Sequence, residues 1–510
     1  MFGGRRLGLS DVGTDRVAWR RARALPGVRR RLIVFGLPAV AGVSLGCAAL
    51  LAIALTGSVA VGLSVLVGLA GMVALPLVIV QPRLALFVLL VDVGNVYAIV
   101  TRLTKVSALI LAMLVAAMAI LFGVARHRVV LIWSPVFLLA MVFLASRAFT
   151  LLFAQDPSLG LGLIAQGGKA LIYLFVVSVL LCSAPEKGVS GIVAAAKVVV
   201  IVLTVLAALT VLQEFIFHNS TSFAGFSTIK GEGLGALTPR HAGPLGDPNE
   251  WARVLALFAP LTLAVWASER AGWRRSVWLV AFIVIAVAIY LTQSRGGFLA
   301  LALSVAIFFV LSRKHQHRMV LGAPVVVVAL LVVAPGGGER LGTLREAAGA
   351  AEQGGDQSLV GRFVMGRVAL AVFADHPAIG VGTGNFDLVS PDYQRRMGVA
   401  VVRRLGSHDV YLEMAAESGL LGLASWILFY GSAVFVVVRA RRIFERLPPG
   451  DESSRAGQLV SAGVLAGLGG WAFASLFLSL GDMRYLTVAI ALGVALDIDA
   501  RREARIVGES

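Results

Sequence analysis

Charged residues and cysteines are both scarce in this sequence of 510 residues. Asp, Glu, Lys and Arg make up 14% of the chain, whereas soluble domains carry about 25%, so an ordinary soluble globule is excluded. The high apolar content excludes intrinsic disorder. The only two cysteines, Cys47 and Cys182, lie in or at the end of apolar runs and far apart. We expect both to pack as small hydrophobic side chains, which excludes a disulfide-built scaffold.

Acidic residues are the scarcer of the two charged classes. The chain has 28 Asp and Glu against 45 Lys and Arg, a formal net charge of +17. Such an excess is typical of proteins that bind nucleic acid. Here, however, most basic residues lie in short clusters between apolar runs, where the positive-inside rule explains them. The charge therefore orients membrane crossings, and nucleic acid is not an expected partner.

Long apolar runs are what the sequence has in abundance. Hydrophobic residues make up 58% of the chain, and the mean hydropathy is +0.88. A helix needs about 20 apolar residues to cross a bilayer, and lipid-exposed backbone must be helical. We therefore predict an all-α polytopic membrane protein with about 12–14 transmembrane helices. The segments are 32–56, 58–80, 84–100, 106–123, 131–152, 169–183, 190–217, 250–267, 275–292, 296–312, 319–335, 418–438, 459–480 and 484–497. Because 169–183 and 484–497 are short, either could be re-entrant.

The basic N-terminal segment sets the predicted orientation. Its long following apolar run and the lack of a small-residue cleavage site argue against a cleaved signal peptide. With this segment in the cytoplasm, alternation puts most basic loops and both termini there. The predicted organisation is a cytoplasmic segment 1–31, transmembrane helices 32–217, a catalytic region 218–440 and C-terminal helices with a tail, 441–510. A large external loop, 336–417, lies within the third part.

Polar residues collect in two external segments, 218–249 and 336–417. The first ends in "TPRHAGPLGDPNEWA", a turn-rich stretch that leads into a helix near Asn249. The second contains an amphipathic helix near 358–375, the turn "DHPAIGVGTGNF", and "SHDVYLEMAAESGLLGL", which enters the next span. "GVGTG" lacks the third glycine of a dinucleotide fingerprint, so it predicts a tight turn.

Each candidate site residue has a structural alternative. Arg295, at the external junction of two adjacent segments, either snorkels to the head groups or binds an anion. Arg240 and Arg362 are either solvated loop charges or anion ligands. His408 is either a helix-start residue after an N-cap Ser407 or a general base.

Two further patterns favour a structural reading. Asp409, Glu413 and Glu417 share one helix stripe, which predicts a solvated acidic face. His315 and His317 lie in a basic cluster without a nearby acid or cysteine, so no metal site is predicted.

The external residues form a more specific set together than singly. Arginines can hold phosphates in bidentate fashion, and a histidine can accept a proton near neutral pH. The sequence shows no nucleophile triad, no H-E-x-x-H motif and no Asp-rich cage. The external arginines and the histidine together suit a displacement reaction in which a hydroxyl attacks a carbon that bears a phosphate leaving group.

Four stretches, in order, resemble the O-antigen ligase and O-antigen polymerase superfamily. They are "RHAGPLGDPNEWA" at 240–252, "TQSRGGFLAL" at 292–301, "GRFVMGRVALAVFADHPAIGVGTGNF" at 361–386 and "SHDVYLEMAAESGLLGL" at 407–423. The resemblance implies a GT-C-like, metal-independent, inverting glycosyltransferase without a cofactor. Such an enzyme moves a glycan from undecaprenyl diphosphate to a glycan or glycolipid acceptor, in lipopolysaccharide or exopolysaccharide synthesis, at the outer face of the bacterial cytoplasmic membrane.

The resemblance also implies residue roles. Arg240 and Arg295 would hold the diphosphate, His408 would be the general base, and Arg362 would help to shape the site. Asp247 and Asn249 have the character of turn-closing residues. The chain departs from the family in its larger number of predicted spans and in a glycine-rich insertion, 336–357.

Two other functions stay open from the sequence. A transporter or flippase of a lipid-linked glycan would also be polytopic, but its intramembrane charges should recur in paired halves. Here those charges are scattered, at Asp92, Arg147, Lys197, Glu214 and Arg253. A cell-wall glycan polymerase of the shape, elongation, division and sporulation family shares the donor but not the four motifs. Ligase and polymerase are not distinguished, and the oligomeric state is open.

Overall fold

The computed structural model describes most of the chain after residue 77. The described residues are 78–79, 81–104, 107–183, 188–230, 239–269, 272–312, 357–399, 408–448 and 452–508. All of them belong to one compact unit, Val78–Ser510. The segments expected at 32–56 and 319–335, most of 58–80, and Cys47, His315, His317 and Ser407 lie outside these residues.

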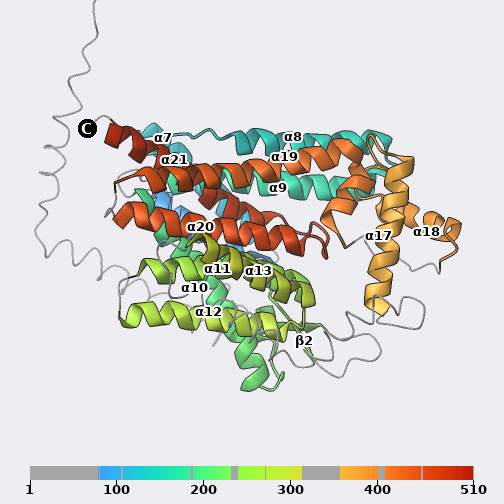
Figure 1. Cartoon of the computed structure of the whole chain (residues 1–510), viewed down its shortest axis with the longest axis horizontal. Helices are drawn as coiled ribbons and strands as arrows, with labels where there is room; N and C mark the ends of the chain where they lie inside the picture. Colours follow the sequence, from blue (N-terminus) through green and yellow to red (C-terminus); the bar gives the residue numbers. More distant parts are fainter. Residues whose placement is uncertain are drawn as a thin grey trace, which may run out of the picture. The chain divides into compact units, whose positions relative to one another are not determined.

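The described part is almost entirely helical (Figure 1). In chain order it contains α5 (Pro82–Leu90), η2 (Val91–Gly94), α6 (Val96–Thr104), α7 (Ala108–Ala125), α8 (Pro135–Thr150), η3 (Leu151–Phe153), α9 (Pro157–Cys182), α10 (Gly188–Phe215), η5 (Phe223–Gly225), β1 (Thr228–Lys230), β2 (Arg240–Gly243), α11 (Pro248–Ser268), α12 (Trp273–Leu291), α13 (Arg295–Leu311), α17 (Gln357–Asp375), α18 (Phe386–Arg396), α19 (Val410–Arg446), α20 (Glu452–Ala474) and α21 (Arg484–Gly508).

The predicted all-α polytopic fold is confirmed. Among the described residues, 8 helices are long and apolar enough to cross a membrane, or up to 9 if the bent pair of α5–η2 and α6 counts as one span. Large apolar side chains such as Leu114, Leu121 and Phe435 are exposed on these helices. A bilayer accommodates such surfaces, whereas water would not.

Three predicted segments differ from the helices observed. The run 84–100 is not one straight helix, because Asn95 adopts a left-handed conformation (φ 58°) and the two halves bend by 80°. The run 169–183 is the second half of the 26-residue α9, which is long enough to span, so the re-entrant alternative is wrong. The run 484–497 begins α21, which extends to 25 residues.

Helix starts follow local capping chemistry. Asp156 and Asp247 cap α9 and α11 by accepting hydrogen bonds from backbone N–H groups two or three residues later, and a proline occupies the first turn of each helix. Ser134 does the same for α8. The first N–H groups of a helix have no partner within the helix, so a proline, which lacks an N–H, fits there at no cost. The positions of these helix starts therefore follow from neighbouring residues in the sequence.

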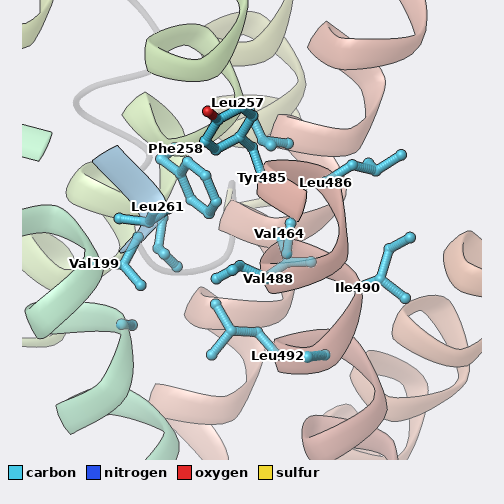
Figure 2. Packing of buried hydrophobic residues seen from close by; sticks show 14 of the residues in the cluster. Val199, Leu257, Phe258, Leu261, Val464, Tyr485, Leu486, Val488, Ile490 and Leu492 are labelled. Atoms are coloured by element: carbon cyan, nitrogen blue, oxygen red, sulfur yellow. The ribbon is translucent and has the colours of Figure 1, made fainter. Parts of the chain in front are cut away.

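α11 forms the centre of the bundle, with 94% of its membrane-length window buried, against 28% for α7. Figure 2 shows Leu257, Phe258 and Leu261 of α11 beside Val199 of α10 and Val464 of α20. Close approach requires small residues, as is common between membrane helices. A Cβ added at Gly467 of α20 would lie 2.0 Å from the Leu257 carbonyl oxygen.

The non-helical elements gather at one end of the helices, which we call the hairpin end (Figure 1). It comprises the antiparallel β1–β2 hairpin, α17, α18, the starts of α11, α13 and α19, and residues 151–156 and 475–483. In the hairpin, Lys230 pairs in register with Arg240. The helix predicted near 358–375 is observed as α17.

Candidate functional site

Arg240 joins three elements at the hairpin end. From β2, its Nε donates to the Thr292 carbonyl oxygen (3.2 Å), and its Nη2 donates to the Asn249 side-chain oxygen (3.1 Å). Thr292 lies in the turn between α12 and α13, and Asn249 lies in the first turn of α11. The Arg240 guanidinium is therefore held beside the turn that leads to Arg295.

Arg295 is the first residue of α13 and is half-buried. Ser294 caps this helix by accepting from the Gly297 N–H (3.2 Å). A Cβ at Gly297 would lie 2.4 Å from Cβ of Ala252, so the first turn of α13 packs directly on α11. A positive charge at a helix N-terminus is unfavourable, because the helix dipole is positive there. An anion bound at this position would be stabilised by the helix dipole and by the Arg295 guanidinium. The position of Arg295 at the start of α13 fits an anion ligand and a structural residue alike.

Asp247 fixes the start of α11. Its Oδ1 accepts from the N–H groups of Asn249 (2.8 Å) and Glu250 (3.2 Å), and its Oδ2 pairs with Lys230 of β1 (3.1 Å). Burial acts to raise its pKa, but the Glu250 N–H and Lys230 together hold the pKa below the ordinary value. Asp247 thus has the turn-closing role that its sequence context indicates, whereas the Asn249 side chain instead accepts from Arg240.

His408 lies immediately before α19 with a left-handed backbone (φ 50°) and a half-buried side chain. Burial lowers its pKa, and the positive charge of Arg362 lowers it further, against the opposing effects of Asp247 and Asp387. The pKa of His408 therefore lies below that of an ordinary histidine, which favours the neutral imidazole. A neutral imidazole can accept a proton.

The structure brings the four predicted residues to one end. His408 and Arg362 interact electrostatically, and the same imidazole interacts with Asp247 and Lys230. Through Asn249, the start of α11 is hydrogen-bonded to Arg240, which in turn reaches the turn before Arg295. Residues from β2, α13, α17 and the α19 start, far apart in sequence, therefore meet at the hairpin end.

The N-cap of α19 differs from the prediction. Asp409, not Ser407, caps the helix, because its Oδ1 accepts from the N–H groups of Tyr411 (2.8 Å) and Leu412 (3.0 Å). Burial raises the pKa of Asp409, against the effect of these two N–H groups. The cap sets the position of the adjacent His408.

The predicted solvated acidic face on α19 is wrong. Glu417 is buried and pairs with Arg147 of α8 (3.2 Å), and each side chain is 7% exposed. The turn at 377–385 closes over this pair: the Val381 N–H donates to the Ala416 carbonyl oxygen (3.0 Å), and the Gly382 N–H donates to that of Glu417 (2.9 Å). The predicted tight turn at "GVGTG" is thereby confirmed, with Gly382 at φ 95°.

The intramembrane charges that look scattered in the sequence are paired. The pairs are Asp92 with Arg484 (2.7 Å), Lys197 with Glu269, Glu214 with His241 (2.9 Å) and Arg253 with Glu250. Arg253 also donates to the Ser479 carbonyl oxygen (2.8 Å) and lies 4.2 Å from the centroid of Trp471. Arg253 and Glu250 are one helical turn apart, whereas the partners in the other three pairs come from segments distant in the sequence.

No group of three or more His, Cys, Asp or Glu residues in the described ranges is placed to hold a metal ion. Cys182 is a free, half-buried thiol.

Residues 279–427 match the family model described as O-antigen ligase. The match contains Arg295, Arg362 and His408, while Arg240 precedes it. The resemblance to the O-antigen ligase superfamily is confirmed by this match over residues 279–427, and the chain is a polytopic membrane protein. No curated protein matches the chain.

Proposed function

We propose that this protein transfers a glycan from an undecaprenyl diphosphate carrier to a hydroxyl of a glycan or glycolipid acceptor. The observation that supports this most is the gathering of Arg240, Arg295 and Arg362 with His408, whose lowered pKa favours the neutral imidazole, at one end of a membrane bundle. Three of the four residues lie in the family-matched stretch. The lipid carrier would lie in the bilayer beside the helices.

The proposed reaction is a single inverting displacement. The acceptor hydroxyl oxygen attacks the anomeric carbon, His408 takes the hydroxyl proton, and the bond from that carbon to the diphosphate oxygen breaks. Arg240 and Arg295 offset the negative charge that grows on the leaving diphosphate, as planar guanidinium groups do well. Burial and then the positive charge of Arg362 favour the neutral form of His408 before the reaction.

We further propose that the hairpin end faces outward from a bacterial cytoplasmic membrane. The opposite end carries Arg126, Arg128, Arg274, Arg442 and Arg446. Under the positive-inside rule, that end and the C-terminal end of α21 belong in the cytoplasm. The site then opens to the side where carrier-linked glycans are used.

The substitution His408→Ala tests the function. Glycan transfer by the purified protein in lipid should fall by roughly 10²–10⁴-fold, the usual contribution of a general base. His376→Ala is the matched control, because His376 is an exposed histidine just after α17. Near-normal transfer by the His408 variant would exclude this base. Movement of carrier-linked glycan across the bilayer without transfer would instead indicate a flippase.

The type of transfer is tested in cells. Deletion of the gene should cause long carrier-linked chains to accumulate if the protein is a ligase, and single carrier-linked repeat units if it is a polymerase. Mass analysis of the lipid-linked pool distinguishes the two.

A further inference from the structure

A cavity of about 310 Å³ lies between α8 and α9, outside the arginine site. Arg147 of α8, Gln166 and Gly167 of α9, Glu413 of α19 and Asp482 line its polar part. We call it the α8–α9 cavity. Its volume is in the range of sites that hold small organic groups.

Two buried polar atoms at this cavity have no hydrogen-bond partner in the part of the chain that the structure describes. They are Nε of Arg147 and Oε2 of Glu413. The Arg147 side chain is only 7% exposed, so bulk water does not supply the missing hydrogen bond. Buried polar groups are normally satisfied, and such exceptions indicate a missing partner. Both residues line the cavity, and the Glu413 carboxyl group also accepts hydrogen bonds from the Ser479 side chain and the Leu480 N–H.

An apolar extension adjoins the polar part. A smaller cavity, lined by Ala140, Leu144, Gly167, Ala170 and Leu174, shares Leu144 and Gly167 with the larger one. Leu163, which also lines the larger cavity, is 39% exposed on the outer surface of α9. The smaller cavity measures only about 20 Å³, so the apolar chain of a molecule with a polar head would lie along the lipid-facing side of α9 beside Leu163.

The charges of the cavity distinguish its ligand from a diphosphate. Arg147 is already paired with the Glu417 carboxylate, and Glu413 adds a second carboxyl group. A diphosphate would meet these carboxyl groups unfavourably and fits the arginine site better. Sugar hydroxyls can donate to Glu413 and accept from Arg147, which matches the two unpartnered atoms.

One residue that lines the cavity, Glu413, lies on α19, the helix that begins just after the proposed base. Glu413 follows His408 by five residues, a rise of about 7–8 Å along a helix. The Val410 N–H donates to the Ser475 carbonyl oxygen (2.9 Å), and Ser479 in the same segment both lines the cavity and accepts from Arg253 of α11. The segment 475–483 thus lies between the cavity and α11.

We propose that the α8–α9 cavity binds the sugar head of the membrane-anchored acceptor, with its lipid chain along the lipid-facing side of α9. This inference rests on the proposed function, because it assigns the second substrate of the same transfer. The diphosphate donor occupies the arginine site, and the acceptor reaches His408 from the cavity.

Photo-crosslinking tests the proposal. The probe is dodecyl maltoside with a diazirine in its alkyl chain, added to the full chain in phosphatidylglycerol nanodiscs, and labelled peptides are mapped by mass spectrometry. Labelling should concentrate on α8 and α9 around Leu144 and Leu163. Excess dodecyl maltoside should compete, and dodecyl phosphate should not.

Matched variants of α9 sharpen the test. Gly167→Leu fills the cavity, because a Cβ there would already lie 2.8 Å from Cδ1 of Leu144, whereas a Cβ at Gly162 meets nothing within 4 Å. Gly167→Leu should reduce specific labelling at least fivefold, and Gly162→Leu should not. Gln166→Leu, which keeps the bulk and suits a membrane helix, should remove the preference for the maltoside.

The outcomes separate this proposal from the proposed function. Even labelling of all lipid-facing helices, or equal labelling of the Gly167 and Gly162 variants, would overturn the acceptor site. Specific labelling should persist in His408→Ala, whose loss of transfer is the separate test of the function. Normal transfer by that variant would overturn the function while leaving sugar binding at the cavity measurable.

Discussion

At the scale of single residues, the electrostatic surroundings of His408 decide what it can do. Its position before a helix would suit a structural residue equally well. Burial and the Arg362 guanidinium lower its pKa, which favours the neutral form. That property of the imidazole cannot be read from the sequence, because Arg362 precedes it by almost fifty residues.

The pH dependence of transfer follows from this interaction. Transfer should be lost as the pH falls through the lowered pKa of His408, because protonation removes the base. Arg362→Gln deletes a charge that opposes the imidazolium and should raise this pKa, so the acid limb of the kcat/KM profile moves to higher pH. An acid limb at an unchanged pH in the variant would contradict the proximity of the two groups.

Arg367→Gln is the control for the profile. Arg367 lies on the same helix and is exposed. Its replacement should leave the acid limb in place.

At the scale of elements, the start of α19 holds the proposed base. Asp409 caps the helix and stands next to His408 in the chain, so the cap and the base share one stretch of backbone. The same helix carries Glu413 to the cavity and Glu417 to Arg147. One element therefore connects three polar features that differ in role.

The cap can be tested with two substitutions. Asp409→Ala should cost about 1 kcal/mol at the helix start and reduce transfer about fivefold, because His408 loses its fixed position. Asp409→Asn retains an oxygen that accepts from Tyr411 and Leu412, so its transfer rate should stay near that of the parent. Equal losses in both variants, measured as initial rates, would show that the charge rather than the cap matters.

At the scale of the whole molecule, the two ends of the helix bundle carry different kinds of charged groups. The paired and site-forming charges lie mainly at the hairpin end, and arginine clusters occupy the other. A lipid-facing surface of apolar side chains encloses the crossings between them. This distribution of positive charge between the two ends supports the proposed orientation, because the positive-inside rule assigns the arginine clusters to the cytoplasm.

Labelling in intact cells tests the orientation. Ser220→Cys places a thiol at the hairpin end, and His127→Cys places one at the opposite end; both positions are exposed. A membrane-impermeant maleimide should label the Ser220 variant in intact cells and the His127 variant only after lysis. The parent chain, with Cys47 and Cys182, provides the background, and the reverse pattern would invert the topology.

Much of the fold could be predicted from the sequence because lipid imposes it locally. Runs of apolar residues must be helical in a bilayer, so the crossings from α7 to α13 follow from composition alone. Caps such as Asp247 are also local, since the acceptor and the N–H groups lie within three residues. The break at Asn95 escaped prediction because Asp92 and Asn95 are only two polar residues within a long apolar run, which is still long enough for a single helix.

The sequence by itself determined that the chain spans a membrane, which family it resembles, and which arginines and which histidine are candidates for the functional site. Only the tertiary structure decided which of them meet and that Glu417 is buried against Arg147 rather than solvated. It also decided that α8 and α9 enclose a cavity beside α19. The physical reason is range: helix formation depends on neighbouring residues and the solvent, whereas ion pairs and cavities depend on segments more than two hundred residues apart, which only packing brings into contact.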